Sequence, residues 1–169
     1  MSAEASWRLL IDEDAVVSLA AAIDPRFKAL VLLLRHSGLR WCEAIALRRR
    51  SCFVAEGSIE VAEEAREDHS GIRFRRLRTE GWVSVRDADK EALAEHLARY
   101  VGEYRGALVF SDHDGAPLRS SWFHHVAWLP ALEVAGLASD LGVADLQAAR
   151  LRSWQIEAGA SLARLRGGR

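Results

Sequence analysis

The chain has 169 residues, which suits one globular domain spanning residues 1–169 and excludes a large multidomain enzyme. Hydrophobic residues make up 50% of it and charged residues 28%, which provides material for a core and excludes a disordered chain. No apolar run approaches the roughly 20 residues of a membrane helix, and no signal peptide opens the chain, so we expect a cytoplasmic protein without membrane contact. The net charge of −1 gives no overall field for a polyanion, so binding of nucleic acid must depend on local basic clusters.

The first third of the sequence predicts helices. Asp12 or Asp14 can cap a helix that runs through Ala22, and Asp24-Pro25 starts a second with Asp as N-cap and Pro at its first position. This second helix carries apolar residues at core spacing up to His36, so we expect it to be largely buried.

The second helix should stop at Ser37-Gly38, where glycine tolerates a left-handed cap. A third helix is predicted from Arg40 to Leu47. From Cys52 to Arg86 the apolar period changes to two, which indicates a small antiparallel sheet. Its predicted turns are Glu56-Gly57, Ser70-Gly71 and Glu80-Gly81.

Helices return after the sheet. They are predicted from Asp87 to about Tyr104, from Ser120 or Ser121 to an interruption at Pro130, and from about Val143 to Ala158. A turn is expected at Asp114-Gly115 and Pro117. The order of helices, small sheet and helices predicts an α+β fold that is mostly helical.

Arginines are clustered although the net charge is small. Bidentate guanidinium groups suit phosphate, so these clusters are the candidate contacts to a DNA backbone. For Arg48–Arg50 the alternative is a solvated helix end. For Arg73 to Arg78 the alternative is an edge strand that its charges protect from aggregation. The clusters are Arg35, Arg40, Arg48, Arg49 and Arg50; Arg73, Arg75, Arg76 and Arg78; and Arg150 and Arg152.

One segment resembles a known motif. Ser37-Gly-Leu-Arg-Trp-Cys-Glu-Ala-Ile-Ala-Leu-Arg48 is similar to the Thr-Gly-Leu-Arg-x-x-Glu-x-x-x-Leu-Arg box of the tyrosine recombinases, or phage integrases. Further similarities follow in the family's order, so the resemblance covers nearly the whole chain. They lie at Gly57-Ser-Ile-Glu-Val, Arg78-Thr79, Leu108-Val-Phe, Gly115-x-Pro-Leu, Trp128-Leu-Pro-Ala-Leu and Ser153-Trp-Gln-Ile-Glu-Ala-Gly159.

The resemblance implies helices packed around a small antiparallel sheet, as in the recombinase catalytic core. In that family a Tyr attacks the DNA phosphodiester, two Arg neutralise the non-bridging oxygens, and Lys and His move protons. Arg40 falls on the first Arg, and Arg78 falls on the Lys of the hairpin. An Arg is a poor proton donor at that position because its pKa is too high, so both are vestigial catalytic positions.

The rest of the catalytic set is absent by motif. The His-x-x-Arg-His stretch falls on Ala144, Gln147 and Ala148 in one register, and on Asp145, Ala148 and Ala149 in the other. The sequence ends at Arg169, before the segment that carries the nucleophilic Tyr, so we expect a truncated catalytic core. By motif, Tyr100 and Tyr104 are not the nucleophile, and we assign them to packing or surface roles.

No metal or cofactor is predicted. His113, His124 and His125 lack a third ligand at suitable spacing, and Cys42 and Cys52 lack zinc-ligand spacing and are expected to be reduced. Asp112-His-Asp-Gly115 lacks the later Glu of a calcium loop and predicts a turn.

These observations predict a catalytically inactive integrase-like domain. We expect a monomer that binds duplex DNA through phosphate contacts, regulates an intact recombinase, or does both. Arg40 could instead be an ordinary helix-end Arg paired with Glu43. The alternative functions are a protein-interaction module without DNA binding, a fragment of a larger site-specific integrase, and an active enzyme whose missing groups come from another chain.

Overall fold

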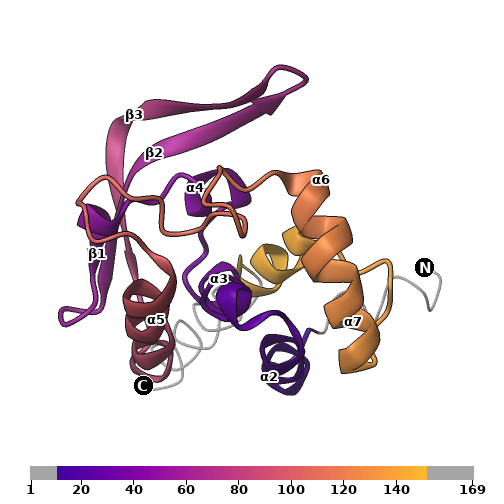
Figure 1. The fold of residues 1–169 in the computed structure, drawn as a ribbon. Helices are drawn as coiled ribbons and strands as arrows, with labels where there is room; N and C mark the ends of the chain where they lie inside the picture. Colours follow the sequence, from indigo (N-terminus) through magenta and orange to yellow (C-terminus); the bar gives the residue numbers. More distant parts are fainter. Residues whose placement is uncertain (1–10, 152–169) are drawn as a thin grey trace, which may run out of the picture.

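The computed structural model describes residues 11–151 and shows helices around a three-stranded antiparallel sheet, which confirms the predicted α+β class (Figure 1). The elements are α2 (Glu13–Ala22), α3 (Pro25–His36), α4 (Trp41–Ala44), β1 (Cys52–Phe53), β2 (Ser58–Asp68), β3 (Gly71–Ser84), α5 (Asp87–Tyr100), α6 (Ser120–Phe123) and α7 (Leu129–Ala135). Residues 143–151 form the described part of a further helix. No helix in this described range is long and apolar enough to cross a membrane.

The first two predicted helices begin directly after predicted N-cap residues, Asp12 and Asp24. The Asp12 carboxylate accepts the Ala15 N–H at 2.8 Å, and the Asp24 carboxylate accepts the Arg26 N–H at 2.9 Å. Gly38 follows α3 with a φ of 79°, the left-handed conformation that favours glycine. As expected, α3 is largely buried and lies at the centre of the helical layer (Figure 1).

The third helix is shorter than predicted and ends at Ala44 rather than at Leu47. The chain beyond it pairs its backbone with a distant segment: Leu47 O accepts the Val109 N–H and Ala107 O accepts the Arg49 N–H, both at 2.9 Å. Because these backbone groups form hydrogen bonds with a distant segment, they do not form the hydrogen bonds of a continuing helix.

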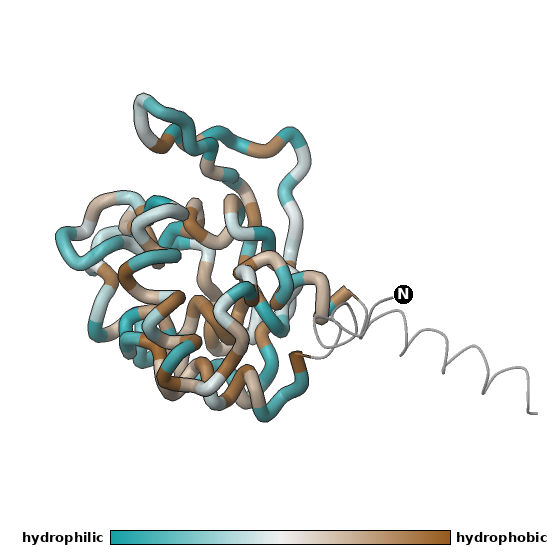
Figure 2. Tube along the Cα trace, turned by 90° about the vertical axis from the view of Figure 1, so that its right-hand side faces the viewer, coloured by the Kyte–Doolittle hydropathy of each residue, from teal (hydrophilic) through white to brown (hydrophobic). Residues whose placement is uncertain are grey.

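The predicted turn at Glu80-Gly81 is wrong, because β3 runs through it without a break. Val61 pairs with Gly81 and Glu63 pairs with Arg76, so Ala62 alone lies opposite residues 77–80 of β3. This bulge bends the hairpin. We call the part beyond it, Glu63–Asp68 with Gly71–Arg76, the hairpin arm. The arm extends above α4 toward α6 and is largely hydrophilic (Figures 1 and 2).

Pro130 does not interrupt its helix, contrary to the prediction. A π-helical turn over His124–Trp128 joins α6 to α7, and Leu129 N–H donates to His124 O, five residues back. Proline lacks an N–H and clashes with the carbonyl four residues earlier in an α-helix. The wider turn just before Pro130 changes this register, so α7 continues to Ala135.

A buried polar cluster ties α2, α3 and the start of α5 together. The two ring nitrogens of His36 lie 2.8 Å from Asp89 Oδ2 and 3.1 Å from Glu13 Oε2. Arg86 donates to the same two carboxylates, at 2.9 Å and 3.0 Å. Asp89 and His36 are each only 4% exposed, so this cluster supplies hydrogen bonds inside an otherwise apolar interface.

Candidate nucleic-acid interface

Arg40 lies at the N-cap of α4, between the hairpin arm and the last described helix. Its guanidinium donates to Glu43 Oε1 from Nε at 3.0 Å and from a terminal nitrogen at 2.8 Å. A terminal nitrogen also lies 3.5 Å from Glu64 Oε2 on β2. Two residues earlier, Gly38 O accepts the Gln147 side-chain amide at 3.5 Å.

The Arg40 side chain is 52% exposed, so it faces solvent rather than a closed cleft. Its pairing with Glu43 agrees with the structural alternative drawn from the sequence. Its position beside the hairpin agrees with the site implied by the recombinase motif. A half-exposed guanidinium already held by carboxylates can still exchange them for another anion.

Glu64 is the meeting point of three arginines. Arg66 lies 3.4 Å from Glu64 Oε1, Arg75 donates to the same oxygen across the hairpin, and Arg40 approaches the other oxygen. The Glu64 side chain is only 9% exposed, whereas the three arginine side chains are 52–68% exposed. The hydrogen bond from Arg75 is the largest influence on the Glu64 carboxyl and lowers its pKa, so the carboxylate is ionised at neutral pH.

The run Arg48–Arg50 is engaged inside the fold. Arg48 lies 3.2 Å from Glu63 and from Gly106 O, and its guanidinium covers the Phe74 ring at 4.5 Å. Arg49 donates to Leu97 O at 2.8 Å and so caps the C-terminal end of α5. Arg50 pairs with Glu63 at 2.8 Å. Arg48–Arg50 lies beyond the end of α4, and these contacts show that it is not simply a solvated helix end.

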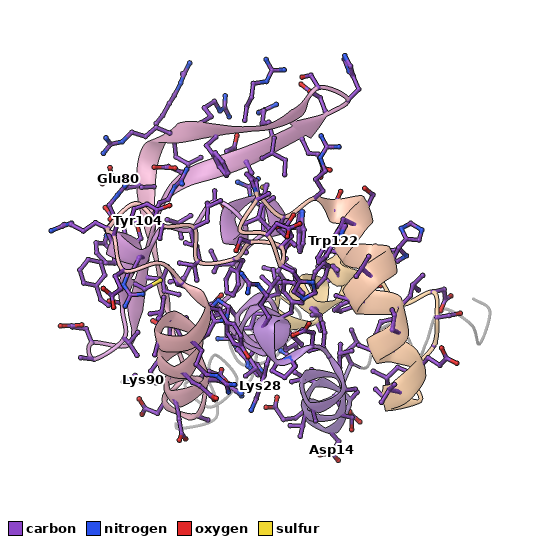
Figure 3. All side chains as sticks on the ribbon, in the orientation of Figure 1. Asp14, Lys28, Glu80, Lys90, Tyr104 and Trp122 are labelled. Carbon is purple, nitrogen blue, oxygen red and sulfur yellow. The ribbon has the colours of Figure 1, made fainter. Side chains whose placement is uncertain are left out.

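The β3 arginines are the most exposed of the predicted site residues. Arg73 pairs with Asp68, and Arg76 lies 2.5 Å from Glu80, with the two arginine side chains 75% and 78% exposed. Arg78 lies in the bulge, is exposed, and forms no ion pair with any residue of the described range. Figure 3 shows basic side chains directed away from the body along this hairpin, with Glu80 near the bend.

Arg35, Arg150 and Arg152 are the remaining predicted arginines. Arg35 is half-buried on α3 and Arg150 is half-buried in the last described helix. Arg152 lies outside the described residues. Of the predicted arginines in the described range, Arg40, Arg50 and the four on β3 are exposed, whereas Arg35, Arg48, Arg49 and Arg150 are half-buried.

A cavity of about 470 Å³ lies beside α4 and the last described helix. Ala144 and Gln147 line it, together with Trp41, Phe123 and His124. Ala144 and Gln147 belong to one of the two possible registers, whereas Asp145 of the other register accepts the Gly142 N–H at 2.7 Å and caps its own helix. The side chains of Ala144 and Gln147 are uncharged.

The histidines and tyrosines singled out in the sequence take other roles. His113 pairs with Asp24 at 2.9 Å, and His125 bonds to Ser121 O at 2.8 Å. Within residues 11–151 no group of three or more His, Cys, Asp or Glu is arranged to hold a metal ion. Tyr100 packs against His96 under two arginines, and Tyr104 is 70% exposed (Figure 3).

The sequence did not predict two features of this interface. One is Glu64, and the other is the attachment of the arm's tip, where Glu67 Oε2 accepts the Ser120 N–H at 3.0 Å and its hydroxyl at 2.7 Å. The sequence of β2, Ser58–Asp68, is rich in acidic residues. Pairing them with the facing arginines of β3 would have pointed to Glu64.

Comparison with known proteins shows a recombinase-like fold. No protein-family model and no curated protein matches this chain. Among solved structures, the XerA recombinase crystal structure gives a TM-score of 0.66 at 19% identity, over 85% of this chain and 47% of that one. The Tn1549 transposon integrase in complex with circular intermediate DNA gives 0.69 at 13% identity, over 83% and 52%. The same integrase with transposon right end DNA gives 0.69 at 13%, over 85% and 52%. The chain spans about half the length of these structures.

Proposed function

We propose that this chain is a tyrosine-recombinase-like domain that holds duplex DNA by its phosphates and does not cleave it. The observation that carries the proposal is the hairpin arm, which presents exposed arginines beside Arg40 on a recombinase-like core. Solved integrases of this fold were captured with DNA, which supports DNA as the partner. In this proposal residues 1–169 act as one monomeric domain in the cytoplasm, with an intact recombinase as a second partner.

Phosphate contacts are assigned to the exposed arginines. Arg73, Arg75, Arg76 and Arg78 on β3 can turn their guanidinium groups toward a backbone without loss of core packing. Arg48 and Arg49 are different, because their donors hold the 102–106 loop and the end of α5. Replacing these two would test stability rather than DNA contact.

The absence of cleavage is inferred from the groups around Arg40. Arg78 replaces a proton-transferring Lys, and Ala144 and Gln147 replace groups that would move protons and neutralise charge. Tyr100 packs against His96 on α5, and by motif neither it nor Tyr104 is the nucleophile. Each missing catalytic group costs orders of magnitude in rate.

Binding of duplex DNA across a salt series tests the first half of the proposal. Neutralising four to six phosphates should give a slope of log K against log salt of about −4 to −5. Replacing Arg76 and Arg78 together by Ala should reduce the magnitude of that slope by about 2, because two phosphate contacts are lost. Fluorescence anisotropy with a labelled duplex measures both.

Arg99→Ala is the control, because Arg99 is also an exposed arginine and pairs with Glu95 on α5, away from the arm. We expect its slope to equal that of the unaltered protein. If no binding of the duplex is detected even at the lowest ionic strength, DNA binding is rejected and the protein-interaction module is favoured.

A nicked suicide substrate tests the second half. We expect no covalent protein–DNA adduct on a denaturing gel after prolonged incubation, because by motif neither Tyr100 nor Tyr104 is the nucleophile. An intact tyrosine recombinase with its own substrate is the positive control. An adduct that disappears in Tyr100→Phe or Tyr104→Phe would show that the domain is catalytic and would overturn this part.

One observation favours the interaction module as a second candidate. The acids of β2 pair with the arginines of β3, so the arm carries much less net charge than its arginine content indicates. Such a surface suits a protein partner with mixed charges. The salt series separates the two candidates.

A further inference from the structure

The arginine cluster around Glu64 has the composition of an anion-binding site. Its guanidinium groups come from three different segments: Arg40 from the start of α4, Arg66 from β2 and Arg75 from β3. Both carboxylate oxygens of Glu64 are used, Oε2 by Arg40 and Oε1 by the other two. Arginines that converge from separate segments on one acceptor are typical of sites for phosphate.

The anion at the centre of this site belongs to the chain itself. The Glu64 side chain is almost fully buried, whereas the side chains of the three arginines are each more than half exposed to solvent. Solvent, and any anion in it, therefore reaches the arginines without moving the backbone. Among the described residues, Glu43 is the one other acid paired with Arg40, so these three arginines and two acids carry a net charge of +1 with Glu64 ionised and +2 without it.

We propose that the Glu64 carboxylate takes the place of a phosphate group, and that Arg40, Arg66 and Arg75 form a phosphate-binding site which this carboxylate occupies. A phosphate group offers the same acceptor oxygens with a negative charge, so the two anions compete for the same donors. A DNA phosphodiester and free inorganic phosphate share this chemistry. For DNA as the source, the inference rests on the proposed function. For free phosphate it does not.

The geometry also predicts that the site survives removal of the carboxylate charge. The arm remains attached at its tip through Glu67 and Ser120, and at its base through the pairing of Val61 with Gly81. Arg40 remains held by Glu43 at 2.8 Å. Glu64→Gln keeps the size of the side chain, removes its charge and replaces one acceptor oxygen by an NH2 group, so it weakens the hold on the donors without opening a void.

Two probes test the proposal on the full chain. With Glu64→Gln, we expect the affinity for a labelled duplex at low salt to rise by about tenfold, the size of one charge-assisted hydrogen bond. We also expect inorganic phosphate to raise the melting temperature of Glu64→Gln in a saturable way, and to have no such effect on the unaltered protein.

Glu133→Gln is the matched control. It makes the same change of net charge on an exposed position of α7, at the far end of the molecule from the arm (Figure 1). We expect neither the gain in DNA affinity nor the phosphate effect in this variant. Adding Arg75→Ala to Glu64→Gln should remove both gains, because it removes one of the three donors.

The two probes separate the inference from the proposed function. Phosphate stabilisation of Glu64→Gln without binding of DNA by any variant would support the site and reject the DNA function. DNA binding that is equal in the unaltered protein, Glu64→Gln and Glu133→Gln, without a phosphate effect, would overturn the site alone. If Glu64→Gln does not fold, Glu64→Asp replaces it: the shorter carboxylate withdraws from Arg40, and a gain in phosphate binding supports the site, whereas no gain overturns it.

Discussion

Replacing Trp128 by Ala is expected to lower the free energy of unfolding by about 3–5 kcal/mol, the range for removal of a large buried aromatic side chain. Trp128 has no exposed surface and packs against Phe123, with ring centroids 6.0 Å apart. Its indole N–H donates to Leu141 O at 2.7 Å, which ties the π-helical turn to the segment before the last described helix. Urea denaturation followed by fluorescence or circular dichroism measures the loss.

Two other variants divide this effect into its parts. Trp128→Phe should cost about 1–3 kcal/mol, because it retains a ring but leaves the buried Leu141 carbonyl without its donor. Trp82→Ala is the control, because Trp82 is 61% exposed and packs only against Phe53 among aromatic side chains of the described range. A loss at Trp82 equal to that at Trp128 would contradict the packing described here.

Replacing Asp89 by Ala is expected to lower the free energy of unfolding by about 3 kcal/mol, because His36 and Arg86 then lose a buried partner. Burial is the largest single influence on Asp89 and would raise its pKa. The hydrogen bonds from His36 and Arg86 together outweigh burial and lower the pKa below its ordinary value of 3.8.

The direction of the pH dependence follows from this lowered pKa. Asp89 contributes its full stabilisation above pH 3.8, and this contribution is lost as the pH falls through the lower pKa of the folded state. Denaturation measured between pH 7 and pH 3 should therefore show a smaller decline for Asp89→Asn than for the unaltered protein. Asp87→Asn, at a side chain that is 93% exposed, should leave both the stability and its pH dependence nearly unchanged. A parallel decline in all three proteins would refute the assignment.

Local signals predicted the elements whose ends are determined by nearby residues. The caps at Asp12 and Asp24 and the glycine at Gly38 placed α2 and α3 correctly, because these interactions span only a few residues. The predictions failed where distant groups compete. Leu47 bonds to the segment at Val109, and β3 continues through Glu80-Gly81 because β2 pairs with both of its halves.

The sequence predicted which residues belong to the candidate site better than it predicted the contacts between them. The motif at Ser37–Arg48 singled out Arg40, and in the structure this residue lies 3.5 Å from Glu64 of the hairpin. The partners of the arginines depend on strand register, which a bulge at Ala62 shifts, so Glu64 could not be paired with Arg40 from periodicity. Gln147 likewise reaches the cavity only through the packing of the last described helix.

The attachment of Glu67 to Ser120 has a consequence for how the molecule can respond to a bound strand. Since the tip of the arm is bonded to the first residue of α6, lifting the arm breaks the hydrogen bonds that Ser120 donates through its amide and hydroxyl. Ser120 also lines the cavity beside Trp41. Displacement of the hairpin and a change in the shape of that cavity are therefore one coupled event, and amide hydrogen exchange at Ser120 would report it.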